Sequence, residues 1–167
     1  MGLTEFGHFA LISAFVLSLI QSAVPLYGAA RQDMQLMLIG PAAALSAAIA
    51  SLIAFGALVT AFTRSAFSVA LVANHSHSAK PLIYKISGTW GNHEGSLLLW
   101  ILILMIYGAV LALSGRGMPT RLKARILAVQ GMISSAFRAF SLLTSNPCAP
   151  LAQAPMDGKR LNPILQD

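Results

Sequence analysis

The sequence predicts an all-α membrane protein with about four transmembrane helices, and three observations lead to that fold class. Of the 167 residues, 56% are hydrophobic and only 10% are charged, whereas soluble domains carry about 25% charged residues. The mean hydropathy is +0.72, so a soluble fold of this size would leave much apolar surface in water. The apolar residues also gather in runs about 20 residues long, the length a helix needs to cross a bilayer.

Four such runs give the expected spans. The first contains His8, Gln21 and Pro25, the second has Pro41 near its start, the third carries no charge, and the fourth contains Arg138. Their expected bounds are residues 6–30, 36–62, 95–113 and 126–144.

The second span carries small residues at every fourth position. Gly40, Ala44 and Ala48 form a stripe on one face of this helix, and such a stripe lets a neighbouring helix approach closely. The alternative is an alanine-rich helix whose small residues have no such contact.

Positive charge between the spans predicts the orientation. The short connection 115–125 holds Arg116, Arg121, Lys123 and Arg125, while the tight turn 31–35 adds only Arg31, offset by Asp33. Positively charged short loops face the cytoplasm. Both termini, the outer loop 63–94 and the outer tail 145–167 are then expected outside, in the periplasm of a bacterium. This topology also accounts for the net charge of +6, so no nucleic-acid partner is expected.

The N-terminus lacks the pattern of a cleavable signal peptide. Glu5 precedes the first apolar run and no basic residues do. We therefore expect the first helix to remain in the protein.

The segment "WGNHEGS", Trp90 to Ser96, stands directly before the third span. One interpretation is structural: Asn92 caps the helix, and Glu94 lies in its first turn. The other is functional: His93 at the mouth of an apolar span ligates a haem iron or orients a substrate, with Glu94 as its partner. A zinc-protease motif is excluded, because position 97 is leucine rather than histidine.

Four other candidates carry weaker signals. His75 and His77 share a face only in a strand and are too few for a closed metal site, so a solvated loop and no metal are expected. His8 is expected at the membrane interface. Arg138, inside the fourth span, either contacts haem propionates or points outward at the rim, and the rim is favoured. Cys148 is the single cysteine, so no disulfide within the chain is expected.

Several longer stretches resemble one family. "NHSHSAKPLIYKISGTWGNHEGSLLLWILIL", "QSAVPLYGAAR", "KARILAVQG" and "LLTSNPCAPLAQAPMDGKRLNPILQD" occur in this order. They resemble the CcmF family, the haem lyase subunits of cytochrome c maturation, and the resemblance covers essentially the whole chain.

The resemblance implies a function in cytochrome c maturation. Members of the family receive haem from the haem chaperone CcmE, work with a CcmH-like subunit and attach haem to apocytochrome c in the bacterial inner membrane, or in the mitochondrial inner membrane of an organelle. By the family motif, the candidates for a haem vestibule are Trp90, Gly91, Asn92, His93, Glu94, Gly95 and Ser96.

Family members continue beyond the stretch that matches the end of this chain, and their haem-ligating histidines lie there. We therefore expect no haem axial ligand in these 167 residues and no catalysis by this chain alone, but an N-terminal portion that acts with a second chain carrying the rest. Two alternatives remain: a small multi-pass transporter or channel subunit, and an inactive truncated remnant.

Overall fold

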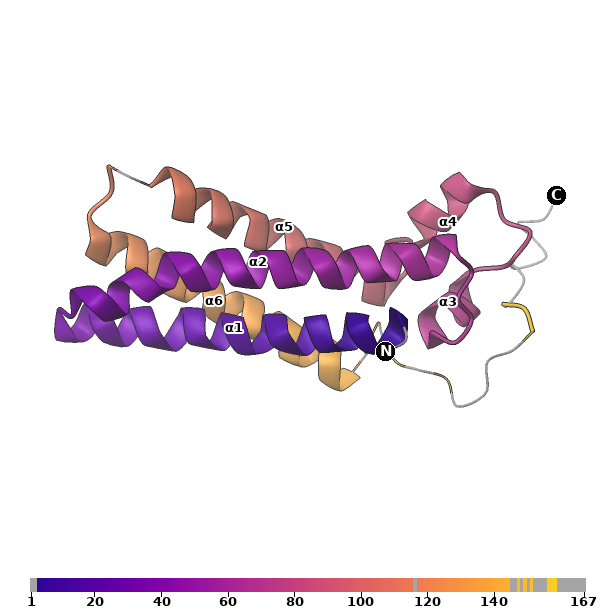
Figure 1. The fold of residues 1–167 in the computed structure, drawn as a ribbon, viewed down its shortest axis with the longest axis horizontal. Coiled ribbons are helices and arrows are strands. Elements are labelled where there is room, and N and C mark those ends of the chain that lie inside the picture. Colours follow the sequence, from indigo (N-terminus) through magenta and orange to yellow (C-terminus); the bar gives the residue numbers. More distant parts are fainter. Residues whose placement is uncertain are drawn as a thin grey trace.

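A computed structural model describes residues 3–115, 117–144, 147, 149, 151 and 156–158. Within these residues the fold is a bundle of four long helices with two short helices at one end (Figure 1). The six helices are α1 Leu3–Arg31, α2 Met34–Thr63, α3 Ala70–His75, α4 Leu82–Gly88, α5 His93–Ser114 and α6 Thr120–Thr144. The helices α1, α2, α5 and α6 are long and apolar enough to cross a membrane, so the predicted fold class is confirmed and the chain is a multi-pass membrane protein.

The predicted tight turn after the first span is confirmed. Gln32 takes a left-handed conformation with φ 60°, which ends α1. Asp33 then caps α2, because its side-chain carboxylate accepts hydrogen bonds from the backbone N–H groups of Gln35 (2.9 Å) and Leu36 (3.3 Å). Residues 32–33 therefore reverse the chain and place α1 and α2 antiparallel.

The small-residue stripe on α2 is a packing face, as the sequence predicted. Ala48 packs with Ile101 and Met105 on α5, and Ala44 packs with Ala112 and Leu127. Gly40 lies against α1, where a Cβ atom added to it would lie 3.1 Å from the Cγ atom of Pro25. Short side chains therefore let three helices approach α2 along its length.

Two glutamines join three of the helices. The Gln21 side-chain amide donates to the Gln130 side-chain oxygen (2.8 Å) and to the Leu127 carbonyl (2.9 Å), which links α1 to α6. The Gln130 amide in turn donates to the Leu104 carbonyl on α5. Because a bilayer offers these amides no water, the contacts between the helices supply their partners.

The prediction that Arg138 points outward at the rim is wrong. Its side chain is 0% exposed, and its guanidinium donates a hydrogen bond to the Ser51 hydroxyl on α2. The sequence gives the depth of a residue along a helix but not which face of the helix turns inward. Two other guanidinium nitrogens, Nε and Nη1, have no partner among the described residues.

The segment 63–94, expected as a loop, contains the two short helices α3 and α4. In α3, Leu71, Val72 and Ala73 are buried, and Val72 belongs to the same apolar cluster as Phe62 of α2 and Leu98 of α5. This cluster also contains Ala10 near the start of α1. The segment therefore closes the end of the bundle where α2 stops and α5 begins (Figure 1).

The Arg138–Ser51 contact predicts opposite effects of two substitutions. Ser51→Ala removes the hydroxyl that accepts from the buried guanidinium, so it should lower the thermal unfolding midpoint in detergent. Arg138→Leu removes the buried charge as well, and because a buried charge with unpartnered nitrogens is costly, the apolar side chain should leave the midpoint unchanged or raise it. A midpoint that falls further for Arg138→Leu than for Ser51→Ala would contradict this explanation.

Candidate functional site

The segment Trp90–Ser96 forms a capped helix start. Asn92 has φ −128° and ψ 165°, and its side-chain oxygen accepts a hydrogen bond from the Gly95 backbone N–H at 2.7 Å. Its side-chain amide donates to the carbonyl of Gly88, the last residue of α4, at 2.8 Å. The prediction that Asn92 caps this helix is confirmed, and the same side chain also ties α4 to α5.

Gly95 allows the first turn of α5 to touch the preceding turn. A Cβ atom on this residue would lie 1.7 Å from the carbonyl oxygen of Thr89, so no other amino acid fits without moving the backbone. The neighbouring Ser96 hydroxyl donates to the carbonyl of Trp90. Asn92, Gly95 and Ser96 therefore fix the turn 89–92 against the helix, and they do so without the side chains of His93 and Glu94.

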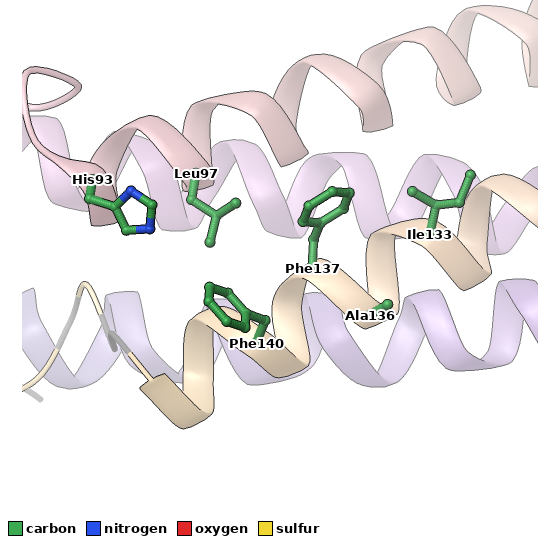
Figure 2. A pocket seen from close by; sticks show the side chains of 6 residues that line it. All are labelled: His93, Leu97, Ile133, Ala136, Phe137 and Phe140. Carbon is green, nitrogen blue, oxygen red and sulfur yellow. The ribbon is translucent and has the colours of Figure 1, made fainter.

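His93 lines an apolar cavity of about 590 Å³. Leu97, one turn further along α5, lines the same cavity, and α6 contributes Ile133, Ala136, Phe137 and Phe140. Figure 2 shows the imidazole of His93 and the ring of Phe140 reaching into this space from opposite helices. The other motif residues do not line it, so the structure separates His93 from the residues that build the cap.

The α6 side of this cavity was not predicted from the sequence. Ile133, Phe137 and Phe140 recur at intervals of four and three residues, which places them on one face of a helix. That stripe was a signal that sequence reasoning could have used. That this stripe and His93 line one cavity depends on how α5 and α6 pack, which the sequence does not show directly.

The two loop histidines have separate partners. His75 Nδ1 lies 3.1 Å from the Leu71 carbonyl oxygen, whereas His77 Nε2 lies 3.1 Å from an oxygen of the Asp157 carboxylate. Within the described ranges, no group of three or more His, Cys, Asp or Glu side chains could hold a metal ion. Cys148 lies outside the described residues.

Asp157 joins the tail to the segment before α4. Its carboxylate accepts from the Ser78 hydroxyl (2.7 Å) and from the Ser78 backbone N–H (3.0 Å). These two hydrogen bonds, with a smaller contribution from His77, lower the pKa of Asp157 below its ordinary value. Since the folded-state pKa is depressed, the contact is present at neutral pH and is lost as the pH falls through that lowered pKa.

Comparison with known proteins finds relatives of one kind. A family model described as cytochrome C assembly protein matches residues 90–167. The cytochrome c-type biogenesis protein ccl1 of Rhodobacter capsulatus is 50% identical over 99% of this chain and 25% of its own length. CcmF of Pseudomonas aeruginosa is 51% identical over 98% of this chain and 25% of its own length. CcmF of Escherichia coli is 39% identical over 98% of this chain and 25% of its own length.

A solved structure agrees with these sequence matches. The cytochrome c haem lyase CcmF superposes with a TM-score of 0.82 and 28% identity, over 89% of this chain and 25% of that one. The chain thus spans about a quarter of the length of the relatives it matches. The comparisons do not favour a transporter or channel subunit.

The close contact at Gly95 predicts that Gly95→Ala is destabilising. The added methyl group would displace the Thr89 carbonyl, and overpacking of this kind costs about 1–3 kcal/mol. Gly117→Ala is the matched control, because a Cβ atom there would meet nothing within 4 Å. Thermal unfolding in detergent, followed by circular dichroism, should give a lower midpoint for Gly95→Ala only. Equal midpoints for the two variants would mean that the turn 89–92 moves freely.

Proposed function

The chain is a relative of the CcmF-type cytochrome c biogenesis proteins over nearly its whole length, and from this premise we propose that it forms the N-terminal membrane part of a haem lyase. This enzyme attaches haem to apocytochrome c. The chain works with a segment that corresponds to the rest of its relatives' length, and this segment belongs either to the same polypeptide or to a second one.

The observation that carries this proposal is the conformation of Trp90–Ser96. The family match begins at Trp90, and from that residue onward the turn is fixed by the Asn92 cap and the Gly95 contact. The turn presents His93 at the edge of an apolar cavity. A rigid turn beside an apolar wall with one imidazole suits the outer vestibule in which a haem lyase handles a flat, apolar macrocycle.

The cavity does not by itself fit a complete haem site. Its six lining residues include one imidazole and no cationic side chain, whereas a bound haem needs axial ligation and partners for its propionates. Arg138 is turned toward Ser51 and does not line the cavity. We therefore assign the wall of the vestibule to this chain and the haem axial ligands to the remaining family sequence.

The proposed setting is the bacterial inner membrane, or the mitochondrial inner membrane if the protein is organellar. In this setting the end of the bundle with α3, α4 and His93 faces outward. The partners there are the haem chaperone CcmE, which delivers haem, a CcmH-like subunit and apocytochrome c. This orientation agrees with the basic residues of the short connection at the other end, Arg121, Lys123 and Arg125.

Cysteine labelling tests the proposed orientation. After Cys148→Ser removes the native thiol, His75→Cys should react with a membrane-impermeant thiol reagent added outside, because position 75 is exposed at the outer end. Pro119→Cys, exposed in the connection between α5 and α6, should react only after the membrane is permeabilised. The reverse pattern would overturn the orientation.

Formation of holocytochrome c tests the function. In a bacterium that lacks its own CcmF, this chain and a polypeptide carrying the rest of the family sequence should together restore haem-stained cytochrome c. His93→Ala should lower that yield severalfold at an unchanged protein level, because the substitution changes the cavity and leaves the cap intact.

His75→Ala is the matched control, since its ring bonds to the Leu71 carbonyl on α3 and does not line the cavity. If His93→Ala leaves the yield unchanged, Trp90–Ser96 serves only to start the helix. If the two wild-type polypeptides are present and form no holocytochrome c, the proposed function is wrong.

A further inference from the structure

The short helix α4 exposes three of its four apolar side chains. It has no buried residue, and three consecutive side chains, Leu82, Ile83 and Tyr84, are 60%, 71% and 63% exposed. A run of exposed apolar side chains of this kind marks a surface that contacts a partner or a membrane.

Contacts on its other side hold α4 in place. The Lys85 ammonium donates to the Ser65 hydroxyl at 2.7 Å. The Gly88 backbone lies close to Phe62 of α2, where an added Cβ atom would be 3.5 Å from the aromatic ring, and the Gly88 carbonyl accepts from Asn92. The direction in which Leu82 and Ile83 point is therefore set by the fold.

The position of α4 along the bundle corresponds to a membrane surface. It follows the end of α2 and precedes the start of α5, and both of these helices are long enough to cross the bilayer (Figure 1). At the ends of helices that cross a bilayer, the lipid headgroups meet the acyl chains. Tyr84 and Trp90, both exposed, are the aromatic residue types enriched there.

A cavity of about 610 Å³ lies beside α4 and combines polar and apolar side chains. Lys80, Tyr84, Ser87 and Trp90 line it together with backbone at Gly88 and Gly91, and none of its lining residues is acidic. The Lys80 ammonium donates to the His75 carbonyl at 2.8 Å, and its partial burial lowers the pKa of this group. A nearby anion would favour the charged ammonium.

We propose that α4 docks on the outer membrane surface and that this cavity takes the headgroup phosphate of an anionic phospholipid. Leu82 and Ile83 enter the acyl region, Tyr84 and Trp90 lie at its boundary, and the Lys80 ammonium pairs with the phosphate. The site is independent of haem handling. A lipid is the favoured occupant, because Leu82 and Ile83 offer an apolar surface for its acyl chains and Lys80 offers a cation for its phosphate. Both lie next to the ends of α2 and α5, which are long enough to cross a membrane.

The first arm of the test measures depth. The 167-residue chain carrying Cys148→Ser and Ile83→Cys is labelled with a nitroxide and reconstituted into phosphatidylcholine vesicles that contain phosphatidylglycerol. The nitroxide should be accessible to oxygen and shielded from a water-soluble nickel chelate. A nitroxide accessible to the nickel chelate, or one shielded only when a polypeptide with the remaining family sequence is added, overturns the proposal.

The second arm measures the headgroup contact. Native mass spectrometry should show that Lys80→Gln binds phosphatidylglycerol about fivefold more weakly, the effect expected of one basic residue near an anionic lipid. Arg64→Gln is the matched control, because it also removes one positive charge at the same end of the bundle, from an exposed side chain that does not line the cavity. Equal affinities of the two variants overturn the proposal.

Discussion

The polar side chains inside the four-helix bundle have to find their partners inside it, because lipid offers none. Gln21 and Gln130 meet this constraint with their side-chain NH2 groups, which donate to the Gln130 oxygen and to the carbonyls of Leu127 and Leu104, whereas the Gln21 side-chain oxygen has no partner among the described residues. Gly108 makes room for the second of them, since a Cβ atom there would lie 2.2 Å from the Gln130 side-chain oxygen. Two amides and one glycine thereby set how α1, α5 and α6 are aligned along their axes.

The same constraint explains the position of the cavity beside His93. Arg138 turns inward and bonds to Ser51 on α2, which fixes the rotation of α6 about its own axis. Phe137 and Phe140, on either side of Arg138 in the sequence, then lie on the half-exposed side of α6, where they line the cavity. A buried cation on one face of α6 and an aromatic wall on another therefore follow from one rotation of this helix.

The sequence was most informative where local chemistry decides the structure. Hydropathy predicted the four long helices, the side chain of Asn92 predicted the start of α5, and the spacing of Gly40, Ala44 and Ala48 predicted a packing face. Each of these features depends on residues that are near in sequence, or on the mean hydropathy of a whole segment. The family resemblance suggested the proposed function, and the relatives are similar to this chain over nearly its whole length.

Features that depend on contacts between distant segments were missed. The helix α3 forms where its apolar residues reach Phe62 and Leu98, and α4 where Gly88 meets Phe62 and Asn92. The inward rotation of Arg138 and the placement of His93 and Phe140 around one cavity likewise depend on how α6 packs. Periodicity placed these residues along a helix but could not say which neighbour each would meet.

The central claim is that this chain forms one wall of a haem-handling site whose iron ligands lie elsewhere. The most direct measurement is the haem Soret absorbance of the tagged 167-residue chain, purified with and without a second polypeptide that carries the remaining family sequence. The claim predicts that the two polypeptides co-purify and that the Soret band appears only when both are present. A Soret band on this chain alone would contradict it and would make His93 the first candidate for the ligand.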